Sequence, residues 1–323
     1  MASKYNKKVY ILHDFNLKLK LYNLTKQIKD TLNKRLNDQL IFISTKEIKK
    51  LKLNEKKIQI FWGNRLNRNL LLRLKNLKWI HLGSSGIDFK LKEEILKKKI
   101  ELTRSNEIIA EAVVASIIHK IFFLGRGMLP LLKKNYYDRK SFDKNFDNIS
   151  NIFNERALIF GKGVIAILLK KKLKAMEIKA KIVKLKSKNK IIKNKNTIND
   201  IKNSKFIINC LPLNKATYNF FDKQIFNLFQ QSHFINIGRG ETVSQRDLIK
   251  FLKNGKIIFA ALDVFNKKDY VSPYRPLNYK SKLWKIDKIF ITPHVSALSN
   301  KYWAYETELF SNILVTKIRK ILI

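Results

Sequence analysis

Residues 156–174 read RALIFGKGVIAILLKKKLK, an apolar run followed by GKGVIA and then by apolar residues at helical spacing. This pattern predicts a strand, a tight turn and a helix. GKGVIA fits GxGxxG/A, in which the first glycine makes the turn, the second admits a pyrophosphate and the small third residue packs helix on strand. We therefore expect a dinucleotide to bind at Gly161, Gly163, Val164 and Ile165.

Strand and helix patterns alternate over most of the chain. Short apolar runs predict strands at residues 8–13, 40–44, 57–62, 78–82, 156–160, 180–185, 205–209, 232–237, 258–263 and 288–292. Helical apolar spacing predicts helices at residues 17–36, 107–124, 164–174, 222–228, 244–252 and 301–322, and the polar stretch 135–154 is expected to be a loop. The alternation predicts an α/β fold with parallel sheets flanked by helices, and 323 residues are enough for two such domains.

Composition favours a cytoplasmic protein. Hydrophobic residues make up 45% of the chain, enough for two packed cores. We see no apolar run near the roughly 20 residues needed to span a bilayer, and no export signal. The single Cys210 cannot form an internal disulfide. We expect no membrane association and no metal site.

The formal net charge is +42, which raises the question of nucleic-acid binding. Lysines are spread over every segment and alternate with Ile and Asn, without aromatics interleaved on one face. Because Lys, Asn and Ile share A/T-rich codons, compositional drift explains the charge better than a nucleic-acid partner does. The positive field would still concentrate anionic substrates and phosphates.

The stretch FINIGRG, residues 234–240, places a cation at the carboxyl end of a predicted buried strand, where ligands bind in open α/β sheets. Two glycines flank Arg239, and its guanidinium can grip a carboxylate through two parallel hydrogen bonds. A small organic acid is therefore the first substrate class to consider.

The end of the strand after the glycine motif indicates which dinucleotide binds. An acidic residue there would hold a ribose 2′-hydroxyl, but the sequence reads VKLKSK. Lys184 and Lys186 instead predict a site for the 2′-phosphate of NADP, with NAD as the alternative. The simpler explanation is that lysines are common everywhere in this chain.

Five further motifs accompany the glycine motif in a fixed order. They are LKWIHLGSSGID (77–88), NCLPLNKAT (209–217), NIGRG (236–240), AALDVF (260–265) and ITPHVS (291–296). With them the chain resembles the D-isomer-specific 2-hydroxyacid dehydrogenases, and its motif wording is most similar to that of the glyoxylate and hydroxypyruvate reductases. The resemblance implies two Rossmann or flavodoxin-like domains: a substrate domain (1–103), a dinucleotide-binding domain (104–292) and a return helix to the substrate domain (293–323). It also implies a homodimer.

The resemblance assigns roles to individual positions. Arg239 would bind the substrate carboxylate and carbonyl, and His294 would be the acid/base. Ser85 and Gly86 would offer backbone N–H groups to the carboxylate. The cofactor would be lined by Leu211, Pro212, Thr217 and Ile237, with Asp263 holding the nicotinamide carboxamide.

One position departs from the family pattern. The family has a Glu before a Pro shortly after the AALDVF motif, and this Glu hydrogen-bonds the catalytic His. Here Lys268 takes the Glu position and Asp269 the Pro position. The resemblance as a whole implies NAD(P)H-dependent reduction of a small 2-keto acid. Asp269 is the candidate to replace the missing Glu beside His294. The alternative is a dinucleotide-binding sensor or interaction protein with impaired catalysis.

Overall fold

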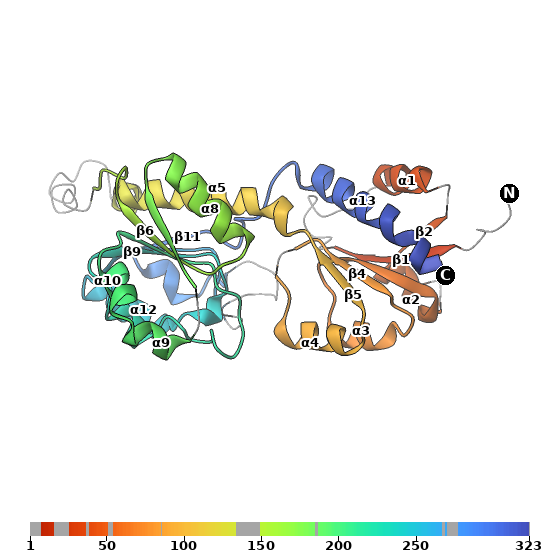
Figure 1. The fold of residues 1–323 in the computed structure, drawn as a ribbon, viewed down its shortest axis with the longest axis horizontal. Helices are drawn as coiled ribbons and strands as arrows, with labels where there is room; N and C mark the ends of the chain where they lie inside the picture. Colours follow the sequence, from red (N-terminus) through yellow and green to blue (C-terminus); the bar gives the residue numbers. More distant parts are fainter. Residues whose placement is uncertain are drawn as a thin grey trace. The chain divides into compact units, whose positions relative to one another are not determined.

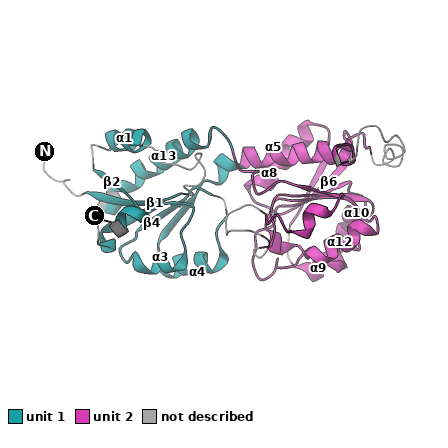
Figure 2. Cartoon of the chain, turned by 180° about the vertical axis from the view of Figure 1, so that it is seen from behind, with its two compact units in different colours: residues 1–109, 299–323 teal, residues 110–298 magenta. Residues whose placement is uncertain are grey.

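The computed structural model describes residues 8–15, 26–36, 39–50, 54–84, 86–133, 149–184, 187–266, 269 and 277–322. The chain forms two compact units (Figures 1 and 2). Unit 1 comprises residues 1–109 and 299–323, and unit 2 comprises residues 110–298. Unit 1 is thus assembled from both ends of the chain.

Unit 1 is built on a five-stranded parallel sheet with the order β2-β1-β3-β4-β5. Its strands are β1 (Val9–Asp14), β2 (Leu40–Ser44), β3 (Ile58–Gly63), β4 (Trp79–Leu82) and β5 (Glu101–Arg104). Its helices are α1 (Lys26–Arg35), α2 (Thr45–Lys50), α3 (Arg68–Arg73), α4 (Phe89–Lys97) and α13 (Tyr302–Leu322), with a 3₁₀ turn, η2 (Glu55–Lys57). This strand order is that of flavodoxin-like sheets.

The returning helix α13 packs on the sheet face opposite α3 and α4 (Figure 1). Its Phe310 is fully buried and stacks on the rings of Trp62 and Trp79, with centroid distances of 4.0 and 5.2 Å. The other face of the sheet is covered by α3 and α4, through buried leucines and Ile95. Both faces are therefore buried around the central strands, which explains why β1, β3 and β4 read as nearly continuous apolar runs.

Unit 2 is built on a six-stranded parallel sheet with the order β11-β10-β9-β8-β6-β7. Its strands are β6 (Arg156–Phe160), β7 (Lys179–Val183), β8 (Phe206–Asn209), β9 (Ser232–Asn236), β10 (Ile257–Leu262) and β11 (Ile289–Ile291). Its helices are α5 (Asn106–Gly125), which begins in unit 1, α6 (Met128–Lys133), α8 (Val164–Ala175), α9 (Lys188–Lys193), α10 (Lys195–Lys202), α11 (Lys223–Phe226) and α12 (Gln245–Lys253). Two 3₁₀ turns are η3 (Gly240–Thr242) and η5 (Lys282–Lys285).

The chain runs from β6 outward to β7 and then crosses back to β8 on the other side of β6. Helices α5 and α8 cover one face of the sheet, and α9, α10 and α12 cover the other (Figure 1). The predicted fold of two parallel sheets flanked by helices is confirmed. In a sheet of this kind, ligands bind at the carboxyl ends of the two strands where the order reverses, here β6 and β8.

Helix α5 corrects one expectation from the sequence. With 20 residues, it is long and apolar enough to cross a membrane by length and composition, although no such run was expected. In the structure, however, Val113, Ile117, Ile121 and Leu124 are buried in the core of unit 2 against α8 and the sheet. Its apolar character is accounted for by this packing, as in the core helix of a globular protein.

Candidate functional site

The turn between β6 and α8 is shaped by two glycines. Gly161 has φ +129°, and a Cβ there would lie 2.9 Å from the carbonyl oxygen of Cys210. Gly163 is the N-cap of α8, and a Cβ built on it would meet nothing within 4 Å. Open space therefore lies in front of the α8 N-terminus, where unpaired backbone N–H groups and the helix dipole favour an anion. Ala166 is buried, so its small side chain lets α8 pack closely on the sheet.

The residues predicted to choose between the two dinucleotides lie just beyond β7. Lys184 follows the strand directly and is exposed to solvent, whereas Lys186 lies outside the described residues. Lys188, at the start of α9, is engaged in an ion pair with Asp222. Of the two lysines that the sequence predicts for a 2′-phosphate, Lys184 is therefore the one that the structure describes, and it is exposed at this strand end.

The loop after β8 folds against the glycine turn. The backbone N–H of Cys210 donates to the carbonyl of Phe160 at 2.8 Å, which joins the ends of β6 and β8. Within the loop, the Thr217 hydroxyl donates to the Pro212 carbonyl at 2.6 Å. Leu211 and Thr217 are buried, whereas Pro212 is exposed. The structure thus brings together the glycine turn and the 210–217 loop, two of the predicted cofactor segments.

Arg239 follows β9 at the same edge of the sheet and is half-buried. A Cβ on Gly238 would lie 2.7 Å from the carbonyl oxygen of Leu211, and one on Gly240 would lie 1.9 Å from the carbonyl group of Phe265. Neither glycine has a positive φ. Close approach of neighbouring backbone, rather than the sharp turn expected from the sequence, therefore explains why glycines flank this arginine.

A buried polar network, which the sequence did not predict, fixes the Arg239 segment. The Asn209 side-chain amide donates to Asn236 Oδ1 at 2.9 Å and to Thr242 Oγ1 at 2.7 Å. The Thr242 hydroxyl in turn donates to the Arg239 carbonyl at 2.6 Å, and Asn209 Oδ1 accepts from the Leu211 N–H at 3.0 Å. The available signal was that NCLPLN and NIGRG both begin with an Asn at a strand end.

Asp263 organises the segment that carries His294. Its Oδ1 accepts from the Thr292 hydroxyl at 2.6 Å and the Val295 N–H at 3.0 Å, and its Oδ2 accepts from the Ser296 N–H at 3.2 Å. His294 has φ +58°, in the left-handed region that favours glycine, and its N–H donates to the Thr292 carbonyl at 2.8 Å. The carboxylate therefore holds a strained segment in place. The expected bond from Asp263 to a carboxamide stays a prediction.

A buried cation lies behind this segment. Lys120, on α5, is 1% exposed and donates to the hydroxyls of Ser116 and Ser296 at 2.6 and 3.3 Å. Burial lowers the pKa of Lys120, and the nearby Asp263 opposes this shift. The lysine therefore complements the charge of Asp263 from the side of α5.

The position where the family pattern has a Glu falls on Lys268, which lies outside the described residues. Asp269 is described, and its backbone is tied at both ends. Its N–H donates to the Asn266 carbonyl and its own carbonyl accepts from the Asn278 N–H, each at 2.8 Å. Its pairing with His294 stays a prediction.

In unit 1, β4 ends in the loop predicted to bind a carboxylate. Gly83 is buried, and its carbonyl accepts from the hydroxyl of Tyr302 on α13 at 2.8 Å. The Ser84 hydroxyl donates to the Gly86 carbonyl at 3.2 Å, which closes a short turn. Ser85 lies outside the described residues. The loop therefore begins at a point that the returning helix fixes.

The motifs of unit 2 lie in a stretch of sequence that matches a known protein family. The sequence model for the D-isomer specific 2-hydroxyacid dehydrogenase NAD binding domain matches residues 127–296, more than half of the chain. The chain belongs to this family.

Individual relatives of these dehydrogenases cover shorter stretches. The glyoxylate reductase of Pyrococcus horikoshii is 34% identical over 97 residues, which are 30% of this chain and 27% of the relative. The glyoxylate/hydroxypyruvate reductase A of Escherichia fergusonii is 34% identical over 97 residues, which are 30% of this chain and 29% of the relative. The aligned part thus spans less than a third of these curated relatives.

The solved structures extend the likeness to the whole fold. The NADPH-dependent glyoxylate/hydroxypyruvate reductase of Sinorhizobium meliloti, in complex with NADP and malonate, matches with a TM-score of 0.70. The match covers 97% of this chain and 94% of that chain at 16% identity. At this identity the comparison shows that the 2-hydroxyacid dehydrogenase fold is shared.

A nicotinamide dinucleotide fits the residues of unit 2. The uncrowded Gly163 leaves room for a pyrophosphate at the N-terminus of α8, whose first turn carries no acidic side chain. Ile237 is buried beside the 210–217 loop, and its N–H donates to the Asn209 carbonyl at 3.2 Å. The glycine turn would therefore hold the central diphosphate, and this loop would line a neighbouring part of the same ligand at the switch point of the sheet.

Proposed function

We propose that the protein reduces a small 2-keto acid to the 2-hydroxy acid with NADPH. The observation that carries this proposal is the pairing, at one edge of one sheet, of an open helix N-terminus behind Gly163 and a half-buried guanidinium at Arg239. The first suits the diphosphate of a dinucleotide, and the second suits a carboxylate. Two curated relatives carry the names of glyoxylate and hydroxypyruvate reductases, which supports a substrate of that size.

The residues divide the chemistry among them. When bound, the reduced nicotinamide supplies a hydride to the keto carbon. Arg239 binds the substrate carboxylate and polarises the carbonyl oxygen, on which negative charge develops. His294 donates a proton to that oxygen. Asp263 keeps the His294 segment in its strained conformation through three hydrogen bonds, and Asp269 favours the imidazolium by its negative charge.

The preference for NADPH rests on Lys184. An exposed lysine at the end of β7 attracts a 2′-phosphate, whereas a carboxylate there would prefer a ribose hydroxyl. We also infer a homodimer, as the family resemblance implies, and a cytoplasmic location, which the single Cys210 supports. The protein's mass in solution, measured by light scattering, tests the dimer directly.

The alternative is a dinucleotide-binding protein without turnover, which Lys268 at the family's Glu position favours. Purified protein is mixed with NADPH, and binding is followed by nicotinamide fluorescence before glyoxylate or hydroxypyruvate is added. Loss of reduced nicotinamide that depends on the keto acid supports the reductase. Binding without such loss, over a panel of small 2-keto acids, supports the alternative.

A further inference from the structure

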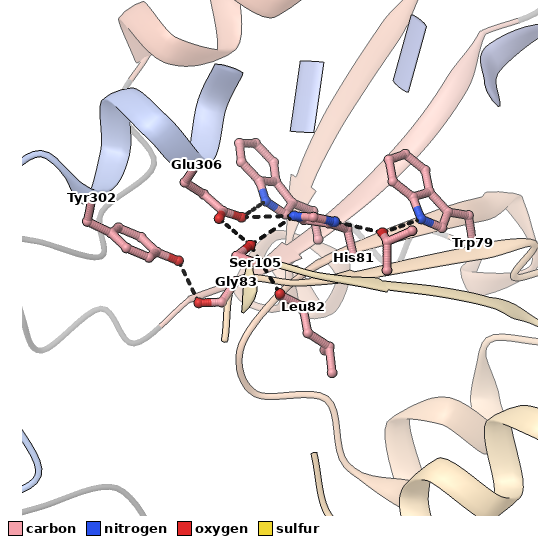
Figure 3. Close-up of polar contacts among 9 residues, drawn as sticks. Trp79, His81, Leu82, Gly83, Ser105, Tyr302 and Glu306 are labelled. Atoms are coloured by element: carbon pink, nitrogen blue, oxygen red, sulfur yellow. Dashed lines mark hydrogen bonds and ion pairs between the residues drawn. The ribbon is translucent and has the colours of Figure 1, made fainter. Parts of the chain in front are cut away.

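The returning helix α13 carries a buried carboxylate that no step of the proposed reaction uses. Glu306 is fully buried in unit 1, where Oε1 accepts from the Trp62 indole N–H at 2.8 Å and Oε2 accepts from the Ser105 hydroxyl. The ring of His81, also fully buried, lies with Nε2 at 3.3 Å from Oε1 and 3.1 Å from Ser105 Oγ (Figure 3). The carboxylate is thus surrounded by three donors.

The far side of the His81 ring is hydrogen-bonded as well. Its Nδ1 lies 2.7 Å from Thr103 Oγ1, which accepts from the indole N–H of Trp79 at 2.8 Å. When the Thr103 hydroxyl donates to Nδ1, the ring proton is on Nε2 and faces Glu306. Every polar atom of the set has a partner (Figure 3).

Burying the Glu306 carboxylate costs desolvation free energy, which its hydrogen bonds must offset. An apolar residue of similar size would often pack as stably at this position. Hydrogen bonds with fixed directions add to the stacking of Phe310 in constraining the rotation of α13 and its position along its axis. The position of α13 relative to the ends of β4 and β5 is therefore determined closely at Glu306.

One turn before Glu306, the same helix reaches the predicted carboxylate loop. The Tyr302 hydroxyl donates to the Gly83 carbonyl at 2.8 Å (Figure 3). A Cβ on Gly83 would lie 2.4 Å from Tyr302 Oη, 2.8 Å from Phe15 Cε1 and 3.2 Å from Glu306 Oε1. The backbone at Gly83 therefore accepts a hydrogen bond from Tyr302 and is surrounded by three side chains, two of them from α13.

We propose that Tyr302 and Glu306 are positioning residues for substrate binding: they hold the start of the loop at Gly83, so that the backbone N–H of Gly86 meets the keto-acid carboxylate. This inference rests on the proposed function. It makes the C-terminal helix a determinant of keto-acid affinity, although neither side chain touches the substrate. NADPH affinity should not depend on either residue, because the predicted cofactor segments lie in unit 2.

The first test is Tyr302→Phe, which keeps the ring and removes the donor to Gly83. We expect KM for glyoxylate to rise about threefold to tenfold, the effect of losing one neutral hydrogen bond. The dissociation constant of NADPH should stay unchanged. Tyr305→Phe is the matched control, because Tyr305 lies on the same helix with 44% of its surface exposed. An unchanged KM in an active Tyr302→Phe enzyme would overturn the proposal.

A second test uses the enclosed glycine. Gly83→Ala alone should raise KM more than Tyr302→Phe does, because the new methyl group meets the tyrosine hydroxyl. In the Tyr302→Phe background, Gly83→Ala should raise KM by a smaller factor, because the tyrosine hydroxyl nearest to the new methyl group is gone. Additive effects of the two changes would contradict the enclosure described here.

The carboxylate is tested by a pair of substitutions. Glu306→Gln keeps an acceptor for Trp62 and should stay close to the wild-type KM, whereas Glu306→Leu leaves the indole and hydroxyl donors unsatisfied and should raise it. If both variants kept the wild-type KM, Glu306 would have only a structural role.

Hydrogen exchange separates failure of this inference from failure of the proposed function. Amides of residues 83–88 should exchange faster in Tyr302→Phe than in Tyr305→Phe or the wild type, whether or not the protein turns over a keto acid. Faster exchange in a protein inactive with all keto acids would refute the reductase while supporting the positioning. Equal exchange in all three proteins would refute the positioning.

Discussion

A buried histidine should make unit 2 sensitive to acid. His233, on β9, is fully buried between the rings of Phe206 and Phe259, with centroid distances of 5.3 and 5.7 Å. Neither ring nitrogen has a hydrogen-bond partner within the described part of the chain. Burial, assisted by the positive charge of Lys205, lowers the pKa of His233 to about 3. The folded state therefore disfavours the imidazolium.

The sign and size of the effect follow from this pKa. The unfolded chain takes up the proton near its ordinary pKa of about 6.5 and the folded chain near about 3, so stability is full above the first value and falls between the two. Between pH 7 and pH 5 this one group should remove about 2 kcal/mol of unfolding free energy from unit 2, at roughly 1.4 kcal/mol per pH unit below pH 6.

His233→Phe tests the prediction, because it keeps an aromatic ring in the slot and removes the titrating group. Urea unfolding of the wild type and the variant at both pH values gives four free energies of unfolding. The wild type should lose about 2 kcal/mol more than the variant on acidification. This difference between pH values does not depend on how well Phe fits the slot at neutral pH. If both proteins lost the same free energy, the account of His233 would be refuted.

Three further predictions concern the proposed reaction. Arg239→Lys keeps the charge but loses the paired hydrogen bonds, so kcat and keto-acid affinity should both fall while NADPH binding, followed by fluorescence, survives. Lys184→Ala should raise KM for NADPH and leave KM for NADH nearly unchanged, with the NADPH preference weakening at high salt; equal effects on both cofactors would exclude a 2′-phosphate contact. If Asp269 has replaced the family Glu, Asp269→Asn should lower kcat on the order of 10²-fold. If no residue has replaced that Glu, Asp269→Asn should leave kcat unchanged. Lys268→Glu should then speed reduction and move the pH optimum upward. A pH–rate profile that neither change alters would exclude both arrangements.

Much of the fold was readable from the sequence because both sheets are parallel and buried on both faces. Each of the ten predicted strands overlaps an observed one, since runs such as RALIF and FINI have no polar face to interrupt them. The strand β5 was missed, because its four residues, ELTR, are partly exposed and give no apolar run. The polar helices α9 and α10 were missed for a related reason: each buries a single residue, and a lysine-rich connection of this kind reads as a loop.

The candidate site was predictable where a local motif fixes the backbone. It was less predictable where side chains that are far apart in the sequence contact each other in the fold. Gly161 and Gly163 could be assigned from spacing alone, and the structure gives the two glycines the expected strained and open positions. The partners of Glu306 lie more than 200 residues away along the chain, so no local pattern announces them. The three hydrogen bonds to Asp263 are a similar case, because they depend on how β10 and β11 pair.

The proposed reduction is tested by mixing the purified protein with NADPH and glyoxylate, or hydroxypyruvate, and following the loss of the reduced nicotinamide beside an Arg239→Lys sample. We expect the wild type to oxidise NADPH only when a 2-keto acid is present, and Arg239→Lys to bind NADPH equally well but to reduce the acid poorly. NADPH oxidation that Arg239→Lys leaves untouched, or none with any small 2-keto acid, would contradict this expectation.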